Sequence, residues 1–336
     1  MRAVTERREL SSIAYGFMAS KALFAALGVD LFTHLAAGPR TTAELSDDTG
    51  IAAHPLQTLL HALSAVGLIV AEGPSYTNAP ACQRYLARGA PGEFGEYFRL
   101  QVAQQIYPAL VHLDAGLAGT GAAFDTFADL LSRPDEARTF TAAQHAGSRA
   151  AARVLAERTR LGDARTMLDV GGGSGAFSIA LCTRNPCLTA TVLDFPAVVD
   201  VARTYRDEAG LGARIDLLPG NAVHDPWPSG QDVVLLSYLL SALGDAEIDV
   251  VLAKARTSLA PGGLLIVHDF MLDDAAPGPA FAALWFLQYL AYRSDGVSFS
   301  ADTISGRLRD HGFTPAASEV LIPETTNTIL ARKAST

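Results

Sequence analysis

The sequence has 336 residues, of which 49% are hydrophobic and 18% are charged, and its formal net charge is −9. This composition excludes a disordered chain, and the length favours two domains over a single core. The lysines are only Lys21, Lys254 and Lys333, so this acidic chain is a poor candidate for binding the phosphate backbone of a nucleic acid.

Membrane, secretion and metal signals are weak in this sequence. Apolar runs such as Val233–Leu236 are shorter than the roughly 18 residues that cross a bilayer, and the charged N-terminus precedes no apolar signal core. Cys82, Cys182 and Cys187 contain no CxxC pair, which favours buried reduced thiols over a disulfide or a zinc site. We therefore expect a soluble, cytoplasmic protein without a membrane partner.

Residues 1–92 have the pattern of a winged helix. Apolar residues recur at helical spacing over Ser12–Leu35, and Gly28 divides this stretch into two predicted helices. The segment Thr41–Glu44 is a capping box that opens a short helix, and His54–Val66 predicts a second helix. Gly67–Thr77 then predicts a small hairpin.

A winged helix raises the alternative of a DNA-binding regulator. From Thr41 to Tyr76 there is no Lys or Arg, so a groove-reading helix would lack the charges that neutralise phosphate. We therefore interpret residues 1–92 as a packing domain that forms a homodimer. Residues 93–160 are alanine-rich and mostly helical, and predict a linker or lid that contains Gln144 and His145.

Residues 161–336 alternate strands and helices, which requires a mostly parallel, doubly wound α/β sheet. Strands are predicted at Thr166–Val170, Leu188–Leu193, Arg214–Leu218, Gln231–Leu236 and Gly263–His268. Helices are predicted at Phe177–Thr183, Ala197–Ala209 and Asp245–Leu259. Ala316–Ile322 and Thr326–Arg332 predict a terminal hairpin that adds an antiparallel strand at the sheet edge.

The glycine-rich stretch that follows Asp169 predicts a nucleotide-binding corner. Gly171, Gly173 and Ala176 satisfy the G-x-G-x-x-G/A pattern, so an NAD-dependent dehydrogenase has to be considered. Asp194, 23 residues after Gly171, fits any cofactor with a ribose diol. Asp169 would repel a pyrophosphate, however. A cationic, phosphate-free adenosine cofactor, S-adenosylmethionine, therefore suits the loop better.

Several motifs together resemble the small-molecule methyltransferases of the caffeate and acetylserotonin O-methyltransferase type, including the bacterial natural-product branch. The resemblance covers nearly the whole chain, through LDVGGGSG, VLDFP, the GN turn, LAPGG and LLIVHDFMLDD. It implies a Rossmann-like class I methyltransferase domain behind a winged-helix dimerisation domain. It also implies a homodimer, S-adenosylmethionine as methyl donor, and no metal.

The resemblance assigns cofactor-binding positions residue by residue. Gly171 would lie against the methionine part of the cofactor, and Gly173 belongs to the same loop. Asp194 would accept hydrogen bonds from both ribose hydroxyls, with Phe195 beside it. Asn221 and Ala222 would border the adenine, although the family usually has Asp at the first position. A further adenine neighbour is Ser237, where many relatives have Lys.

The family's general base is missing from its usual position. The motif HDWxD corresponds here to Ser241–Asp245, so that Ser241 replaces the histidine, and a serine hydroxyl is not a base near neutral pH without an activator. The first candidate for a base elsewhere is His145, with His268 and His224 behind it. Alternatively the acceptor is already ionised, or is a carbon activated by a phenol or enol. A third hypothesis is a family member that binds the cofactor for non-methylating chemistry.

The acceptor pocket is expected to be lined by Phe281–Tyr292 and the lid. Helical spacing places Trp285, Gln288 and Tyr292 on one face, although this face could equally belong to a dimer core. Gln288, where relatives often have Asn, is a candidate hydrogen-bond partner of the acceptor, as is Gln144 from the lid. The aromatic residues favour an aromatic or polyketide-like acceptor, with O-methylation slightly preferred.

Overall fold

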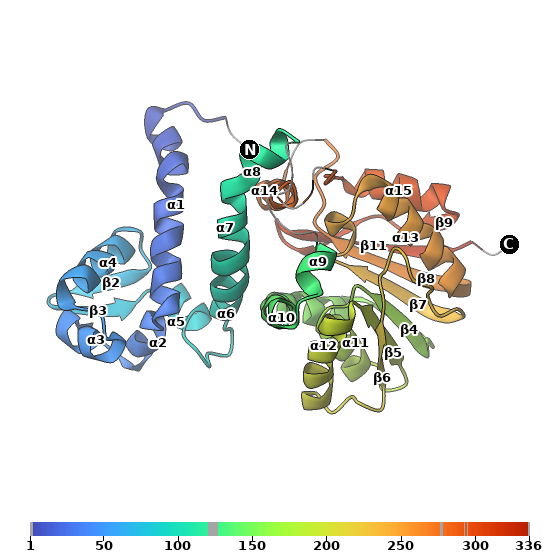
Figure 1. The fold of residues 1–336 in the computed structure, drawn as a ribbon, viewed down its shortest axis with the longest axis horizontal. Helices are drawn as coiled ribbons and strands as arrows, with labels where there is room; N and C mark the ends of the chain where they lie inside the picture. Colours follow the sequence, from blue (N-terminus) through green and yellow to red (C-terminus); the bar gives the residue numbers. More distant parts are fainter. Residues whose placement is uncertain (1–2, 120–126, 276–277, 292, 294, 335–336) are drawn as a thin grey trace. The chain divides into compact units, whose positions relative to one another are not determined.

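The protein forms two compact units, Met1–Tyr107 and Pro108–Thr336 (Figure 1). The computed structural model describes residues 3–119, 127–275, 278–291, 293 and 295–334. The predicted lid, residues 93–160, is divided between the units, because its first part belongs to the N-terminal unit and the rest to the C-terminal unit.

The N-terminal unit has the predicted winged-helix arrangement. Its helices are α1 (Arg7–Gly28), α2 (Leu31–His34), η1 (Leu35–Ala37), α3 (Thr42–Thr49), α4 (Ala53–Ala65), α5 (Pro80–Tyr85), α6 (Gly95–Tyr97) and the π-helical segment η2 (Phe98–Ile106). The strands β2 (Ile69–Glu72) and β3 (Ser75–Asn78) form the hairpin, and β1 (Arg40–Thr41) pairs with β3. The sequence had predicted the two N-terminal helices, α3, α4 and the hairpin, but not η1, β1 or α5.

Two local signals define the helix boundaries of this unit. The capping box is formed: Glu44 N donates to Thr41 Oγ1 at 3.3 Å, and Thr41 N donates to Glu44 Oε2 at 2.7 Å. The long N-terminal helix ends at Gly28, as predicted, and Asp30 adopts a left-handed φ of 52° before α2 begins. Leu56, Leu60 and Leu63 of α4 are fully buried in the core of the unit.

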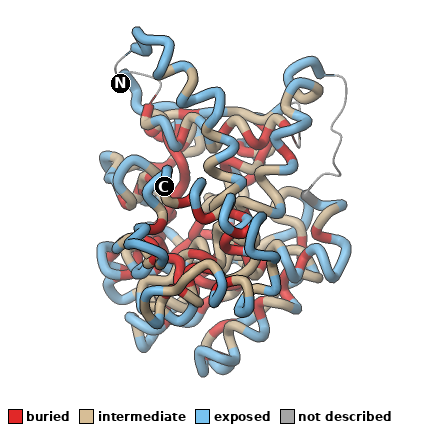
Figure 2. The backbone as a smooth tube through the Cα atoms, turned by 90° about the vertical axis from the view of Figure 1, so that its left-hand side faces the viewer, coloured by how far each residue is buried: buried red, intermediate tan, exposed pale blue. Residues whose placement is uncertain are grey.

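The outer part of α1 presents an apolar surface to solvent, and its first turns are exposed or half-buried (Figure 2). The exposed large apolar side chains on this helix are Leu10, Ile13, Tyr15, Phe17 and Met18. Among the described residues α1 is also long and apolar enough, by length and composition alone, to cross a bilayer. This corrects the expectation that every apolar run is too short.

The C-terminal unit is the predicted doubly wound sheet. Its strands are β4 (Thr166–Val170), β5 (Thr189–Asp194), β6 (Ile215–Pro219), β7 (Gln231–Ser237), β8 (Leu259–Asp269), β9 (Phe313–Pro315), β10 (Glu319–Ile322) and β11 (Thr326–Lys333). The spatial order is β10-β11-β8-β7-β4-β5-β6, with β9 paired to β11. Strands β4 to β8 are parallel, and the terminal hairpin joins β8 through the antiparallel strand β11.

The helices of this unit follow the predicted alternation with the strands. They are α7 (Tyr107–Ala109), η3 (Leu110–His112), α8 (Leu113–Leu117), α9 (Phe127–Leu131), α10 (Pro134–Arg158), α11 (Ala176–Arg184), α12 (Pro196–Glu208), η4 (Leu240–Ala242), α13 (Asp245–Ser258), α14 (Ala280–Tyr289) and α15 (Ala301–Asp310). The helix before the sheet, α10, packs on α11 and α12.

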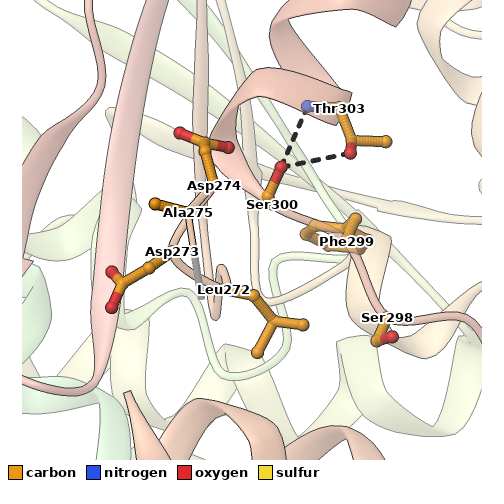
Figure 3. A pocket seen from close by; sticks show the side chains of 8 residues that line it. All are labelled: Leu272, Asp273, Asp274, Ala275, Ser298, Phe299, Ser300 and Thr303. Atoms are coloured by element: carbon orange, nitrogen blue, oxygen red, sulfur yellow. Dashed lines mark hydrogen bonds between the residues drawn. The ribbon is translucent and has the colours of Figure 1, made fainter. Parts of the chain in front are cut away.

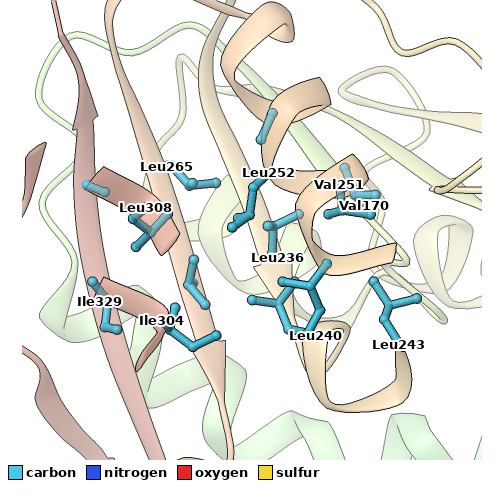
Figure 4. Close-up of a cluster of buried hydrophobic side chains, with 14 of the residues drawn as sticks. Val170, Leu236, Leu240, Leu243, Val251, Leu252, Leu265, Ile304, Leu308 and Ile329 are labelled. Atoms are coloured by element: carbon cyan, nitrogen blue, oxygen red, sulfur yellow. The ribbon is translucent and has the colours of Figure 1, made fainter. Parts of the chain in front are cut away.

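Alternate residues of the central strands bury side chains on opposite faces of the sheet. In β7, Val234 and Leu236 pack with α13 and α15 residues in one core (Figure 4), whereas Val233 and Leu235 pack with α10 and α11 residues in the other. Because both faces are covered, these strands are apolar throughout. The few polar side chains at their carboxyl ends are therefore conspicuous.

Candidate active site

Five polar or glycine residues lie at or just after the carboxyl ends of the parallel strands. Gly171 follows β4, Asp194 ends β5, and Asn221 comes after β6. Ser237 and Asp269 end β7 and β8. The chain leaves β4 for β5 on one side and returns to β7 on the other, so β4 and β7 form the switch point where α/β proteins bind ligands.

The glycine loop depends on positions where no side chain fits. Gly171 and Gly173 have φ values of 63° and 57°, in the left-handed region that favours glycine. A Cβ at Gly172 would lie 2.8 Å from Asp169 Cγ, and one at Gly171 would lie 2.9 Å from Leu239 Cδ1. The loop is therefore pressed against β4 on one side and against the segment after β7 on the other.

Asp169, in β4, packs against the glycine loop at Gly172. Its carboxylate is fully buried, and Oδ2 accepts a 2.6 Å hydrogen bond from Ser178 Oγ at the start of α11. Burial raises the pKa of Asp169 to about 6, opposed by the Ser178 hydrogen bond and reinforced by the charge of Asp194. Among the described residues, Oδ1 has no hydrogen-bond partner. The Ser178 contact ties the strand that precedes the loop to the first turn of α11.

Asp194, the predicted ribose-binding residue, contacts the backbone on both sides of its strand end. Oδ2 accepts the Gly173 N–H at 2.7 Å, and Oδ1 accepts the Phe195 N–H at 2.7 Å. A carboxylate accepts about four hydrogen bonds, so each oxygen keeps a lone pair for a ribose hydroxyl. Burial raises the pKa of Asp194 to about 6, although both N–H contacts lower it. The carboxylate thus joins the glycine loop to the start of α12.

The turn after β6 is held by its own side chains. Asn221 Oδ1 accepts the N–H groups of Val223 and His224 at 2.8 and 3.2 Å. From α13, Lys254 Nζ donates to the carbonyls of Ala222, Val223 and Asp225 at 3.1, 2.7 and 2.7 Å. No motif had indicated Lys254, because it lies about thirty residues from the turn that it holds.

Ser237 and His268 form a buried pair between neighbouring strands. Ser237 Oγ lies 2.8 Å from His268 Nδ1, and His268 Nε2 lies 3.0 Å from Thr326 Oγ1 of β11. Burial lowers the pKa of His268 to about 3. Both ring nitrogens are engaged, which favours a structural role for His268 over that of a base.

The structure brings His145 to the cofactor loop. From α10, its Nδ1 lies 2.8 Å from Ser174 Oγ, and its ring stacks on Tyr205 of α12 with centroids 3.8 Å apart. Burial, with a smaller effect of Arg149, lowers the pKa of His145 to about 4. Its neighbour Gln144 is half-buried in the same helix. His145 therefore lies at the glycine loop, and its Nδ1 is already engaged there.

The position of the missing histidine is occupied by a buried cluster. Ser241 is fully buried in η4, and its N–H donates to Asp269 Oδ2 at 3.1 Å. Ser241 Oγ lies 3.3 Å from Tyr289 Oη. Tyr289 Oη also accepts a hydrogen bond from Trp285 Nε1 at 3.4 Å. Sequence reasoning missed Asp269, and it placed Tyr289 within the expected pocket segment Phe281–Tyr292 without a role of its own.

Helix α14 carries the predicted acceptor-binding residues. Trp285 stacks on Phe270 with ring centroids 4.5 Å apart, so an aromatic wall follows β8. Gln288 is buried, with 5% of its surface exposed. Tyr292, the third predicted member of this face, lies outside the described residues.

A pocket of about 430 Å³ opens after β8, beside the start of α15 (Figure 3). Its lining residues are Leu272, Asp273, Asp274, Ala275, Ser298, Phe299, Ser300 and Thr303. Ser300 caps α15 by accepting the Thr303 N–H at 3.2 Å. The lining includes none of the predicted site residues that the structure describes. We therefore treat this pocket as separate from the candidate active site.

Comparison with known proteins identifies the family of the chain. Residues 116–314 match the O-methyltransferase domain model, and residues 11–88 match the O-methyltransferase dimerisation domain model. The chain is 32% identical over 306 residues to 3-hydroxy-5-methyl-1-naphthoate 3-O-methyltransferase of Streptomyces sahachiroi, covering 90% of this chain and 88% of the relative.

A second relative and a solved structure are also similar to this chain. L-tyrosine C(3)-methyltransferase of Streptomyces lavendulae is 27% identical, covering 94% of this chain and 88% of the relative. The solved structure of human N-acetylserotonin methyltransferase, a complex with SAM, aligns over all of both chains with a TM-score of 0.87 and 24% identity. The last of these similarities concerns the fold.

Proposed function

Since the chain belongs to the O-methyltransferase family, we propose that it methylates a hydroxyl group of a small aromatic natural product. The protein is a methyltransferase, its cofactor is S-adenosylmethionine, and it forms a homodimer through its dimerisation domain. The family supports this activity over the NAD-dependent and DNA-binding alternatives. The observation that carries the proposal is Asp194, which joins the glycine loop to α12 and keeps lone pairs for a ribose diol.

The residues of this chain fit the cofactor. Asp194 would hold the ribose hydroxyls beside Phe195, and the backbone of Gly171 and Gly173 would approach the methionine part. Left-handed φ values and the close approach of Leu239 support this role for the loop. The cofactor supplies an electrophilic methyl group, which leaves sulfur by in-line displacement.

The adenine side of the cofactor would be bordered by the turn after β6. The turn includes Asn221 and Ala222, and Lys254 holds its carbonyls. Asn221 uses its amide oxygen within the turn, which leaves the amide nitrogen as the group to meet adenine. Ser237 would complete this border, although its hydroxyl also contacts His268.

The acceptor would lie against α14. Trp285, stacked on Phe270, offers an aromatic surface, and Gln288 and Gln144 are the proposed polar partners. The name of the naphthoate relative supports an aromatic hydroxyl as the acceptor. The tyrosine C(3)-methyltransferase relative supports methylation of a phenol-activated carbon as the second candidate.

His145 is the residue that the sequence proposes as a base, but its contacts favour a second role. A neutral imidazole with a pKa near 4 is a weak proton acceptor, and Nδ1 already contacts Ser174 in the glycine loop. Holding this loop in place would affect cofactor binding more than proton transfer.

Calorimetry with S-adenosylhomocysteine and with NADH tests the cofactor assignment. We expect binding of S-adenosylhomocysteine only, and Asp194→Ala should weaken it by about 2 kcal/mol, the scale of lost charged hydrogen bonds. Tight NADH binding without S-adenosylhomocysteine binding would refute the assignment.

The acceptor is tested by mass spectrometry after incubation with S-adenosylmethionine and either 3-hydroxy-1-naphthoate or tyrosine. A gain of one methyl on the naphthoate oxygen supports O-methylation, and a gain on the tyrosine ring supports the second candidate. S-adenosylhomocysteine binding without methyl transfer to a wider panel of phenols would favour non-methylating chemistry.

A further inference from the structure

A continuous set of polar contacts replaces the histidine of the family motif. The Trp285 indole contacts the Tyr289 phenol at 3.4 Å, and this phenol contacts Ser241 Oγ at 3.3 Å. The Ser241 hydroxyl in turn hydrogen-bonds the Asp269 carboxyl group, which also accepts the Ser241 N–H at 3.1 Å. Helix α14, the short helix η4 and strand β8 thus each contribute to one buried path.

The chemistry of these groups gives the path a direction. An indole N–H only donates a hydrogen bond, and an ionised carboxylate only accepts one. Ser241 therefore donates to Asp269, its oxygen is available to the Tyr289 hydroxyl, and Tyr289 accepts from Trp285. When the Tyr289 hydroxyl receives a proton, it can donate its own proton to Ser241, and Ser241 can then donate its proton to Asp269.

We propose that Tyr289 and Ser241 pass the proton of the acceptor hydroxyl to Asp269, in place of the family's histidine. This inference rests on the methyl transfer proposed above and narrows the acceptor to a hydroxyl that is neutral when it binds. Tyr289 is the catalytic residue that contacts the acceptor, because Ser241 is fully buried behind it. Ser241 and Asp269 act through Tyr289.

The proton and electron balance of the step is simple. The acceptor oxygen forms its bond to the methyl carbon as the carbon–sulfur bond breaks, and that electron pair stays on sulfur. The acceptor's proton moves to Tyr289 Oη, the Tyr289 proton to Ser241 Oγ, and the Ser241 proton to the Asp269 carboxylate. The products are a methyl ether, a thioether and a protonated Asp269, which later returns its proton to solvent.

The environment of Asp269 suits a proton acceptor. Burial raises the pKa of its carboxyl group to about 6, opposed by hydrogen bonds from Ser241, Phe270 and Leu240. It is thus ionised at neutral pH, yet it binds a proton more strongly than an exposed Asp does. The ionisable neighbours are Tyr289 on the path and His268, the preceding residue. Burial lowers the pKa of His268 to about 3, so His268 stays neutral while Asp269 titrates.

The 3.3 Å contact between Ser241 and Tyr289 is longer than the 2.7–2.8 Å typical of O–H···O hydrogen bonds, and the 3.4 Å contact from Trp285 is longer than the 2.9–3.0 Å typical of N–H···O. Catalytic hydrogen bonds in enzymes without ligand are commonly long and shorten when the substrate binds. Tyr289 has 7% of its surface exposed, so its phenol is nearly buried before the acceptor arrives. An acceptor packed on Trp285 would press the phenol toward Ser241.

A fluorescence titration tests the path without cofactor or acceptor. The chain has 2 tryptophans, so Trp227→Phe leaves Trp285 as the only indole reporter. In this background we expect a change in Trp285 emission with a midpoint near pH 6, because ionisation of Asp269 reorders the hydrogen bonds along the path. Asp269→Asn should abolish the change, and Ser241→Ala should reduce it at least about threefold. An unchanged titration in Asp269→Asn would overturn the proposal.

Kinetics with two probes test proton transfer itself. The probes are 2-naphthol, neutral at the assay pH, and a nitro-substituted 2-naphthol that is already ionised. Tyr289→Phe, Ser241→Ala and Asp269→Asn should lower kcat for 2-naphthol by about 10²–10³-fold, the usual contribution of a general base. Turnover of the ionised probe should fall by less than about threefold, because it has no proton to lose.

Matched variants separate this role from a loss of packing. Tyr76→Phe removes a phenol of the same 7% exposure from the N-terminal unit, and Ser258→Ala removes another buried serine. Both should retain wild-type rates, and Ser241→Thr, which keeps a hydroxyl, should restore most of the rate for 2-naphthol. Equal losses for both probes would overturn the relay while leaving methyl transfer intact. If the wild-type enzyme methylated neither probe, the acceptor assignment would fail and the titration would still decide the relay.

Discussion

His145 Nδ1 lies 2.8 Å from the hydroxyl of Ser174, so a histidine of α10 is hydrogen-bonded to the loop that follows β4. The same ring stacks on Tyr205 of α12, with an interplanar angle of 11°. One side chain therefore links two helices to the glycine loop. We therefore expect cofactor binding to depend on a residue that the sequence had proposed as a base.

Replacing His145 distinguishes the two roles. If His145 holds the loop, His145→Ala should weaken S-adenosylhomocysteine binding about fivefold, the scale of one hydrogen bond, with kcat at saturating cofactor within about twofold of wild type. Calorimetry and steady-state kinetics measure the two effects. A fall in kcat of about 10²-fold or more with unchanged affinity would identify His145 as the base instead. His311→Ala, on the far side of α13, serves as the histidine control.

Replacing Lys254 should weaken cofactor binding through the turn after β6. Lys254→Met removes three hydrogen bonds to carbonyls of that turn, and we expect S-adenosylhomocysteine to bind about tenfold more weakly. Arg214 is a matched control, because it holds the carbonyls of Cys182 and Asn185 at the opposite end of β6. Arg214→Met should lower Tm similarly and leave the affinity unchanged. Equal affinity losses in both variants would point to general destabilisation.

The stability of the protein without cofactor should fall as the pH rises from about 4 to 7. Burial raises the folded-state pKa of Asp169 to about 6 from its ordinary value of 3.8, so protonation favours folding. This stabilisation is complete below about pH 4, is lost as the pH rises through about 6, and amounts to roughly 3 kcal/mol. Burial raises the pKa values of Asp194 and Asp269 in the same direction.

Urea denaturation at several pH values between about 4 and 7 measures this dependence. Asp169→Asn keeps an acceptor for Ser178 and carries no charge, so its free energy of unfolding should vary less with pH than that of wild type. Asp232→Asn is the contrasting variant, because hydrogen bonds from Arg165 and Thr166 hold the pKa of Asp232 below its usual range. An identical pH dependence in wild type and Asp169→Asn would show that this carboxyl group does not titrate in the window.

The apolar surface of α1 should be required for the homodimer. Ile13 and Phe17 are 70% and 53% exposed in the isolated chain, and a charge at either would have to be buried in a dimer contact. We expect Ile13→Asp with Phe17→Asp to give monomers in size-exclusion chromatography with light scattering. Val320→Asp, at an exposed apolar position in β10, should remain dimeric. A dimer that survived the double substitution would place the contact elsewhere.

The sequence by itself predicted the parallel strands, the helices between them and the glycine loop, but not α5, α15 or β9. Strand β4, the glycine turn and α11 follow from a short apolar run, residues without Cβ and helical spacing, all of which act between neighbours in the chain. The same holds for the capping box at Thr41 and for Asp194 at the end of β5. Because these signals involve residues close together in the chain, they can be recognised without knowledge of the fold.

Only the tertiary structure decided which side chains meet across the site. Ser241 contacts Asp269 and Tyr289, which are 28 and 48 residues away. Lys254 reaches the turn after β6 from α13, and His145 reaches Ser174 from α10. Such pairs depend on strand order, on the face that each helix presents and on side-chain rotamers, and no spacing in the sequence records them. The missing histidine was visible in the sequence, whereas the hydroxyl path in its place was visible only after folding.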